Sequence, residues 1–228
     1  MLNDLLTVWF PSCCWSCKKL LAKKQKWLCV SCQTQLPRTY FEQDNNNPLK
    51  ALLRQYIPLE SAYAPFYFMQ NNPIQALLHA LKYQGKKDIG DWLAEQCATY
   101  LPIDHSIFQC DGIVPVPLHE GRQRKRGYNQ VAEFGQFWAT RIGVPYLDDV
   151  LLRKNKTKTL VRMTREDRWE EVKDAFLIQP KKEHKHLLLV DDVITTGATL
   201  TACGSALLDG VCEKISIIGM TYAQNILP

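Results

Sequence analysis

One stretch of fourteen residues constrains the fold of this chain more than any other: residues 187–200 read LLLVDDVITTGATL. Four apolar residues lead into two adjacent carboxylates, Asp191 and Asp192, and a Thr-Thr-Gly-x-Thr loop follows them. The apolar run predicts a buried parallel strand, and the residues after the loop predict an amphipathic helix. The stretch therefore predicts a strand–loop–helix unit in an α/β sheet, with its acids at the edge where such sheets bind ligands.

The residue types in this unit indicate the kind of ligand. Ionised Asp only accepts hydrogen bonds, so Asp191 and Asp192 suit the two hydroxyls of a ribose. The N–H groups at a helix start favour an anion, and a glycine lets the backbone approach it closely. The residues expected to form this phosphate cradle are Thr195, Thr196, Gly197, Ala198 and Thr199. An Asp-rich turn with a Thr cap and no ligand would explain a single threonine, but not the acids and the loop together.

This unit resembles the signature of type I phosphoribosyltransferases. In that family the two acids hold the ribose hydroxyls of phosphoribosyl pyrophosphate, and the Thr/Gly loop holds its 5-phosphate. The resemblance implies the same roles here, with Asp191 and Asp192 as the candidate catalytic pair. It also implies that Mg²⁺ accompanies the pyrophosphate of the ligand.

Two CxxC pairs lie near the N-terminus, Cys14-x-x-Cys17 and Cys29-x-x-Cys32, with eleven residues between them. Two such pairs can place four thiolates around one zinc ion, and a closed four-thiolate site is structural because no position is open to water. A segment this short usually needs a metal or a partner domain to fold. The alternatives to a zinc site are reduced cysteines in the core or a redox-active pair. Cys13 is an alternative ligand to the adjacent Cys14, although only Cys14 gives the CxxC spacing.

Composition and chain organisation limit the class of protein and its division into domains. The chain has 228 residues, of which 46% are hydrophobic and 22% charged, as in an ordinary soluble globular protein. No apolar run reaches the roughly 18 residues of a membrane-spanning helix, and Asp4 stands where a secretory signal would be basic. We therefore expect no membrane insertion and a cytoplasmic location. A polar stretch before Pro48 predicts a zinc-ribbon domain over 1–47 and a second domain over 48–228.

Strand and helix patterns alternate along the second domain. Strands are expected at 61–68, 111–118, 147–152, 175–178 and 215–220, in addition to the strand at 187–190. Helices are expected at 49–56, from Asn72-Pro73 to Gly85, at 88–100, from about 131 to 142, and after the Thr/Gly loop to Gly210. This alternation predicts a parallel sheet with helices on both faces.

A basic segment, HEGRQRKRGYNQ at 119–130, follows the strand at 111–118 and is expected to be a loop. Its position after a strand puts Arg122 and Arg126 at the same sheet edge as Asp191. Arginine binds phosphate oxygens through two parallel hydrogen bonds, so these two are candidates for the pyrophosphate of the ligand. The alternative is a basic surface loop. The net charge of +5 and the neighbouring Arg124 and Lys125 also suit nucleic acid.

The combination of the two cysteine pairs, the segment 114–130 and the segment 187–199 resembles the ComF family. These are bacterial competence-associated proteins with a phosphoribosyltransferase-like domain. The resemblance implies a type I phosphoribosyltransferase-like (Rossmann-like) body, an N-terminal zinc ribbon and a pocket for phosphoribosyl pyrophosphate. It also implies a role in DNA uptake and natural transformation on the cytoplasmic side, with other competence proteins as candidate partners. The lysines and tryptophans of the N-terminal segment suit single-stranded DNA, and the alternative is that these tryptophans only cover the metal site.

One segment departs from the family pattern. Residues 153–171 match the middle segment of the family at Thr157 and Arg168, but Leu160 stands where Gln is common and Glu171 where Asn is common. The corresponding segment of the transferases is their catalytic loop. The role of this segment in the chain is therefore left open.

Three functions are compatible with these features. The first is a ComF-like protein that binds phosphoribosyl pyrophosphate and handles single-stranded DNA during uptake. The second is an active salvage-type phosphoribosyltransferase, in which Asp191 and Asp192 hold the sugar and Arg122 or Arg126 holds the leaving group. The third is a module that only bridges partners. No base-recognising part is evident, and with eight residues after Met220 we expect no long C-terminal hood. We therefore favour the first.

Overall fold

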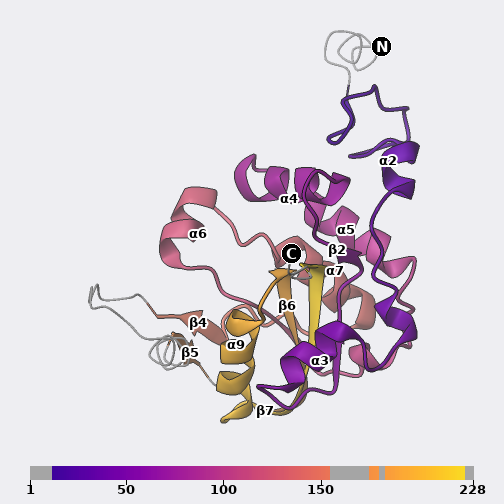
Figure 1. Ribbon diagram of the computed structural model, residues 1–228. Helices are drawn as coiled ribbons and strands as arrows, with labels where there is room; N and C mark the ends of the chain where they lie inside the picture. The colour runs from indigo at the N-terminus through magenta and orange to yellow at the C-terminus, as the bar shows by residue number, and fades with distance from the viewer. Residues whose placement is uncertain (1–11, 155–174, 180–182, 224–228) are drawn as a thin grey trace.

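The computed structural model describes residues 12–154, 175–179 and 183–223, and Figure 1 shows its arrangement. A parallel sheet forms the centre of the molecule. Its strand order is β1 (Ser61–Tyr63), β7 (Cys212–Tyr222), β6 (His184–Ile194), β3 (Gly112–Pro115), and β2 (Phe66–Tyr67) also pairs with β7. The expected parallel α/β sheet is confirmed.

Helices cover both faces of this sheet (Figure 1). On one face lie α3 (Pro48–Arg54) and α9 (Ala198–Leu208), and on the other lie α5 (Ile89–Ala98) and α7 (Ala132–Ile142). Glycines allow close packing within each layer. A Cβ atom added at Gly204 of α9 would lie 2.6 Å from Ile57 Cδ1, and one added at Gly90 of α5 would lie 3.2 Å from the backbone nitrogen of Phe134.

The register of the strands aligns their carboxyl ends at one edge. Val190 of β6 is paired with Ile218 of β7 and with Pro115 of β3. The pairing continues one residue past β3, because the N–H of Val116 donates to the carbonyl of Val190 at 2.9 Å. The apolar run 187–190 is fully buried between the helix layers. The residues that follow β3 and β6 in the sequence are therefore neighbours in space.

The helix α4 (Pro73–Tyr83) begins where the sequence predicts. The side chain of Asn72 accepts a hydrogen bond from the N–H of Gln75 at 2.9 Å, and Pro73 occupies the first turn. The apolar face of the helix is buried, as its spacing predicts, at Leu77, Leu78 and Leu81. At the other end of the helix, Lys82, Tyr83 and the following Gly85 contribute to the site described below.

The basic segment after β3 differs from the expected loop, because residues 120–126 form the helix α6 (Glu120–Arg126). His119 caps it, since its Nδ1 accepts the N–H of Gly121 at 3.1 Å, and Gly127 ends it with a φ of 76°. Glu120 and Arg124 form an i,i+4 ion pair at 2.9 Å. The prediction of a loop was wrong because these local signals outweigh the polar composition.

The strand expected at 147–152 also differs. The backbone N–H of Leu147 donates to the carbonyl of Ile113 at 2.8 Å beside β3, and the strand β4 begins only at Leu151. β4 (Leu151–Arg153) pairs with β5 (Phe176–Ile178) in a separate antiparallel two-stranded sheet. Among the residues that the structure describes, neither strand pairs with the central sheet.

Two further boundaries differ from the prediction. The strand expected at 61–68 is divided by Pro65, which has no N–H to donate, into β1 and β2. The last strand is longer than expected, because pairing between β6 and β7 extends to Ile194 and Tyr222. The remaining short elements are α2 (Val30–Thr34), η1 (Phe41–Gln43) and η2 (Ser106–Phe108).

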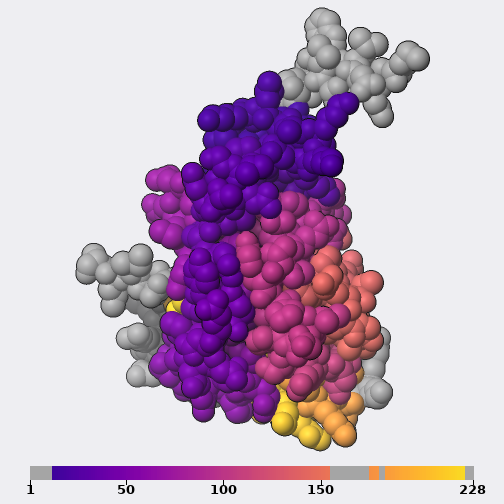
Figure 2. All heavy atoms as spheres, turned by 90° about the vertical axis from the view of Figure 1, so that its right-hand side faces the viewer, coloured from indigo at the N-terminus to yellow at the C-terminus, as the bar shows by residue number. Residues whose placement is uncertain are grey.

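The described part of the N-terminal segment, which begins at residue 12, lies at one end of the molecule (Figure 2). The end of this segment bonds to the sheet region, because the N–H of Tyr67 donates to Pro37 at 2.7 Å and the amide of Asn47 donates to Ala62 at 2.9 Å. The division into domains 1–47 and 48–228 stays a prediction.

The departure from the family pattern lies outside the described residues, because it falls on Leu160 and Glu171, and the matching residues Thr157 and Arg168 lie outside them too. In the part of the chain that the structure describes, no helix is both long and apolar enough to cross a membrane.

Candidate functional site

The two acids lie within the last part of β6, not after its end, because the strand continues to Ile194. Successive residues of a strand point to opposite faces, so the two carboxylates diverge. Asp191 lines a hollow at the start of α9. Asp192 is 7% exposed and meets Lys82 of α4, whose Nζ lies 2.8 Å from its Oδ2. The edge of the sheet thus presents one acid to each side.

The environment of Asp191 disfavours its charged form. Burial raises the pKa of Asp191, and the neighbouring carboxylate of Asp192 raises it further. The backbone N–H of Asp192, which donates to Asp191 Oδ1 at 2.8 Å, and the ammonium of Lys82 lower it by less. The net effect is a pKa above the ordinary range of an aspartate. A ligand that brings hydroxyl donors or a cation to this carboxylate would stabilise its charged form.

The Thr/Gly loop forms a small hollow of about 40 Å³ between β6 and α9. A cavity needs roughly 10–15 Å³ to hold one water, so this hollow has room for a group of a few heavy atoms, such as a phosphate. Thr195 and Thr196 are exposed, whereas Thr199 and Ala198 are half-buried. The hollow is lined by the first residues of α9, where backbone N–H groups have no acceptor within the helix.

Gly197 fixes the shape of this loop. Its φ of 75° lies in the left-handed region, which a glycine adopts without strain. A Cβ atom at this position would also lie 2.4 Å from Leu53 Cδ2, and Leu53 is fully buried in α3. The glycine therefore satisfies two separate requirements, the turn into α9 and the close contact with α3.

A second, larger cleft of about 560 Å³ lies between the end of α4 and α6. Its basic residues are Lys82, Arg122, Lys125 and Arg126, and its aromatic residues are Tyr83 and Tyr128. Because α6 is a helix, Arg122 and Arg126 lie four residues apart and share one face of it. Both arginines therefore line the same cleft, which they would have to do in order to bind one pyrophosphate together.

Two contacts hold the walls of this cleft together. The hydroxyl of Tyr128 donates to the carbonyl of Leu81 in α4. The guanidinium of Arg126 lies over the ring of Tyr83, 5.3 Å from its centre, and donates to Gln130 at 2.6 Å. The end of α4 is therefore fixed against the segment that follows β3.

Lys82 connects the cleft to the acids, because it lines the cleft and also binds Asp192. The sequence analysis did not select it. Its position after buried Leu81, in the last turn of an apolar helix, is the only local signal, and such a lysine is ordinarily a solvated helix end. Only the fold reveals that its side chain is mostly buried against a carboxylate.

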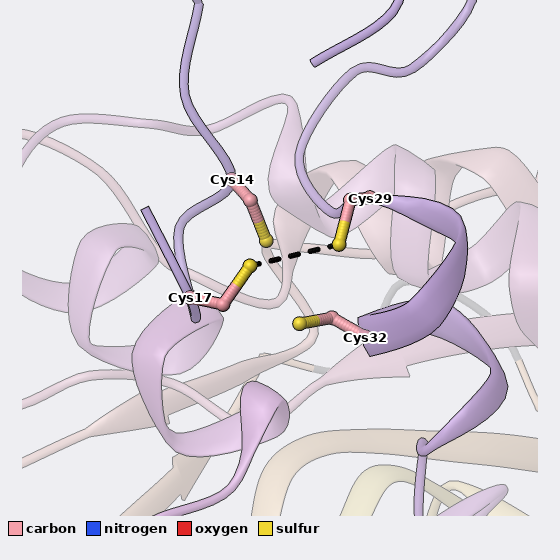
Figure 3. Close-up of side chains that lie close together, drawn as sticks. All are labelled: Cys14, Cys17, Cys29 and Cys32. Carbon is pink, nitrogen blue, oxygen red and sulfur yellow. Dashed lines mark hydrogen bonds between the residues drawn. The ribbon is translucent and has the colours of Figure 1, made fainter. Parts of the chain in front are cut away.

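The four cysteines of the two CxxC pairs converge, as Figure 3 shows. Their sulfur atoms all lie within 4.8 Å of one another, and the Sγ atoms of Cys17 and Cys29 are 3.6 Å apart. Zinc–sulfur bonds of about 2.3 Å place tetrahedral sulfur atoms roughly 3.8 Å apart, so the four thiols could hold a zinc ion. Cys13 is exposed and lies outside this cluster, whereas Cys14 is part of it, which favours Cys14 as the metal ligand.

Local structure aims the four thiols inward. The first pair lies in a tight turn, in which the N–H of Lys18 donates to Cys14 and the N–H of Cys14 donates to Lys19 at 2.8 Å. The second pair starts α2, with Cys29 as the residue before the helix. Burial and then the neighbouring thiols of the cluster raise the pKa of Cys32. Four thiolates so close together need a cation, which is the chemistry of a metal site.

The scattered cysteines are separate from this cluster. Cys97, Cys203 and Cys212 are buried, as expected, whereas Cys110 is half-buried. Burial raises the pKa of Cys97 and of Cys203 well above the ordinary value, which keeps both as neutral thiols.

Comparison with characterised proteins gives consistent names. The chain is 31% identical over 159 residues to competence protein F of Haemophilus influenzae, which covers 66% of this chain and 69% of that protein. It is 26% identical over 235 residues to the DNA utilization protein YhgH of Escherichia coli K12, which covers 93% of this chain and 97% of that protein. The YhgH protein of Salmonella typhi is 27% identical over 239 residues, with the same coverage. No family model matches the chain.

Two solved structures show a partial likeness, and both are named for phosphoribosyl chemistry. Glutamine phosphoribosylpyrophosphate amidotransferase of B. subtilis has a TM-score of 0.39 at 14% identity and covers 60% of this chain and 26% of that chain. Adenine phosphoribosyltransferase of Thermoanaerobacter pseudethanolicus has a TM-score of 0.38 at 18% identity and covers 66% of this chain and 75% of that chain. Likeness at this level is too low to support an argument about the site.

The sequence relationship is the stronger of the two comparisons, because it spans two thirds of a characterised relative at 31% identity. The expected combination of a four-cysteine cluster with a parallel α/β body accompanies it. On this basis the chain belongs to the ComF (competence protein F) family.

Proposed function

We propose that this protein binds phosphoribosyl pyrophosphate and supports DNA uptake in natural transformation, in the cytoplasm, through the handling of single-stranded DNA. The observation that supports this ligand is a set of three subsites near one sheet edge, linked by the ion pair of Lys82 with Asp192. The hollow at α9 suits the 5-phosphate, Asp191 and Asp192 suit the ribose, and the basic cleft suits the pyrophosphate. Lys82 joins the second subsite to the third.

The charges of these subsites match the charges of that ligand. The cleft carries four cationic side chains for a pyrophosphate. The hollow offers helix N–H groups and threonine hydroxyls to a phosphate. The ribose diol is neutral and donates hydrogen bonds, which suits carboxylates that only accept them. The names of the relatives, competence protein F and DNA utilization protein, support the link to DNA.

Magnesium would enter with the pyrophosphate of the ligand. Burial and then the carboxylate of Asp192 raise the pKa of Asp191, so a divalent cation with hard oxygen ligands nearby would stabilise its charged form. When bound, the metal ion would neutralise charge on the pyrophosphate. The residues of this chain would orient the ligand: the acids hold the sugar, and Arg122 and Arg126 hold the phosphates from α6.

The binding proposal is tested with a paired substitution of the acids. Asp191→Asn together with Asp192→Asn should abolish binding of phosphoribosyl pyrophosphate in calorimetry while the circular dichroism spectrum is unchanged. Glu60→Gln is the matched control, because this carboxylate pairs with Lys214 at an exposed site away from the cleft. Unchanged affinity of the double variant would remove the sugar subsite from the proposal.

Turnover is the alternative, as an active phosphoribosyltransferase of nucleotide salvage. A pyrophosphate-release assay with a panel of nucleobases and with single-stranded DNA separates the two. Release with one base would establish the enzyme, whereas binding without release supports the binding protein. The acceptor is not specified by any of the subsites described above.

A groove of about 530 Å³ beside the cysteine cluster supports the DNA part of the proposal. It is lined by Trp15 and Trp27, whose ring centres are 6.0 Å apart, and the ammonium groups of Lys18 and Lys26 lie 5.7 and 5.9 Å from these rings. Aromatic rings beside cations bind single strands without sequence preference. Covering the metal site is the other role that these tryptophans can serve.

A gel-retardation assay distinguishes these two roles of the tryptophans. Trp15→Ala should weaken binding of single-stranded DNA at least about fivefold, in line with the loss of one stacked base, and leave bound zinc unchanged. Tyr56→Ala is the control, because it removes an exposed aromatic side chain at the end of α3. Loss of zinc in Trp15→Ala, with no specific effect on DNA, would assign the residue to the metal site.

The biological role is tested by deletion. A strain of the source organism that lacks this chain should lose transformation, and expression of the Asp191→Asn, Asp192→Asn variant should not restore it. Full restoration by that variant would separate the competence role from the sugar-phosphate site.

A further inference from the structure

Lys82 makes the ion pair at the centre of the site. Its Nζ lies 2.8 Å from Asp192 Oδ2, and the two side chains are 21% and 9% exposed. That oxygen is inaccessible to water and has no hydrogen-bond partner besides this ion pair within the described residues. A buried carboxylate without a partner is strongly unfavourable, so Asp192 depends on this lysine while no ligand is present.

The same lysine also belongs to the basic cleft. It extends from α4 into a space that Arg122, Lys125 and Arg126 enter from α6. Lysine has a flexible four-carbon stem and a compact charge, so its ammonium can exchange partners by a change of rotamer. The cleft is therefore one cation richer when Lys82 turns away from Asp192.

We propose that Lys82 is a transferable counter-ion, which neutralises Asp192 while the cleft is empty and moves to a phosphate oxygen when a pyrophosphate group enters. The inference rests on the proposed function for the class of ligand, but it concerns only the pyrophosphate end of the site. Its source is the double position of one side chain, which forms an ion pair on one side and lines the cleft on the other.

The transfer makes the site selective. When Lys82 leaves Asp192, the carboxylate needs a new donor, and a ribose hydroxyl can supply it. Phosphoribosyl pyrophosphate carries both the phosphates that attract Lys82 and the hydroxyls that replace it. Inorganic pyrophosphate has no such hydroxyls, so its binding leaves Asp192 unpaired and is weakened. Lys82 thus favours the complete ligand over free pyrophosphate.

Calorimetry with inorganic pyrophosphate, in the presence of Mg²⁺, tests the transfer in four forms of the full chain. Relative to the native protein, Lys82→Met should bind pyrophosphate about tenfold more weakly, since a charge-assisted hydrogen bond is lost. Asp192→Asn should bind it about fivefold more tightly, since the lysine no longer has to leave a carboxylate. In the double variant, Asp192→Asn should give no such gain.

The double variant separates the transfer from a simple charge effect. Removal of a negative charge near an anion site would tighten binding in both backgrounds, so an equal gain with and without Lys82 overturns the proposal. Unchanged affinity in Lys82→Met also overturns it, as does a native protein that does not bind pyrophosphate. If the protein binds pyrophosphate but not phosphoribosyl pyrophosphate, the proposed function is wrong. The affinities of the four forms for pyrophosphate then still decide whether Lys82 changes its partner.

Two further variants control for the general loss of a lysine and for a loss of stability. Lys214→Met removes a lysine from another ion pair, with Glu60 at 3.4 Å, and should not change pyrophosphate affinity. Lys82→Arg keeps the positive charge and should retain affinity within about threefold of the native protein, even if Lys82→Met is less stable. Loss of affinity in Lys82→Arg as large as in Lys82→Met, with an intact thermal transition, would contradict a role that depends on charge.

Discussion

The four-cysteine cluster and the carboxyl edge of the sheet are both built from side chains that attract a charged partner, but they are built differently. All four cysteines come from a segment of nineteen residues, 14–32, and short local turns aim their sulfur atoms at one point. The residues of the sheet edge come from α4, α6 and β6, which span residues 73–194, and the register of parallel strands brings them together.

The difference lies in what holds each site in place. The cysteine cluster has few buried apolar residues around it, so a bound metal would supply much of its stability. The sheet edge is anchored by a fully buried strand, so its position depends on the hydrophobic core. At this edge the charged form of Asp191 is disfavoured, because burial and then the carboxylate of Asp192 raise its pKa. The first site would gain much of its structure from a bound metal, whereas the second takes its structure from the hydrophobic core.

The largest effect is expected at the cysteine cluster. Cys32→Ser should remove the bound metal and, because metal binding and folding are coupled, at least about 3 kcal/mol of stability from the N-terminal segment. Metal content by mass spectrometry and limited proteolysis within residues 12–36 would show this. Cys13→Ser should retain the metal, because its thiol lies outside the cluster. Equal metal loss in both variants would mean that the cluster is not a four-cysteine metal site.

The next effect is expected at the loop before α9. Gly197→Ala should lower the free energy of unfolding by about 2 kcal/mol or more, because it adds backbone strain at a positive φ and a clash with buried Leu53. Urea denaturation measures the change. Gly210→Ala is the control, since an added Cβ meets nothing within 4 Å there. A similar small change in both variants would show that the loop adapts and is less fixed than the strand before it.

A smaller effect, and an increase in stability instead of a loss, is expected from substitution of Asp191. Because its pKa is raised in the folded state, the carboxyl group favours folding below its unfolded pKa of about 3.9, and that contribution is lost as the pH rises towards the folded pKa. Asp191→Asn should therefore raise the melting temperature at neutral pH by about 2 °C or more, and the gain should vanish below about pH 4. Thermal unfolding between pH 4 and pH 8 measures this.

The control for this pH dependence is Asp209→Asn, in an exposed residue at the end of α9. It should leave the melting temperature within the error of the measurement at each pH. A gain in Asp191→Asn that is the same at all pH values would contradict the unfavourable charge at the sheet edge. The electrostatic difference drawn above between the cysteine cluster and the sheet edge would then be wrong.

The smallest effect on stability is expected at Arg124 and Lys125 of α6, of which Lys125 also lines the basic cleft. Arg124 is 82% exposed and pairs only with Glu120 in the described structure, so Arg124→Gln together with Lys125→Gln should change the free energy of unfolding by less than about 0.5 kcal/mol. The same change should weaken binding of single-stranded DNA and reduce the slope of log affinity against log salt by roughly 0.7 for each lost phosphate contact. Gel retardation across a salt series measures the slope, and an unchanged slope would confine DNA to the other groove.

Local sequence patterns predicted much of the structure at both sites. The CxxC spacing predicted the cluster of four thiols, and the apolar run before Asp191 predicted the buried strand, its place in a parallel sheet and the helix after the loop. The helix α6 is the exception, because its basic composition suggested a loop. Its cap at His119, its internal ion pair and its final Gly127 are all local signals, so the sequence does contain the information that specifies this helix.

The sequence by itself determined the chemistry: which residues can hold a metal, which can accept from hydroxyls and which can bind phosphates. Those properties belong to side chains and to spacings of a few residues, which folding does not alter. The tertiary structure alone decided that β6 continues past the two acids, as far as Ile194, and that Lys82 lies between Asp192 and the basic cleft. No local pattern encodes that contact, because it joins residues more than a hundred positions apart, and only the packing of α4 beside the sheet edge brings them within 2.8 Å.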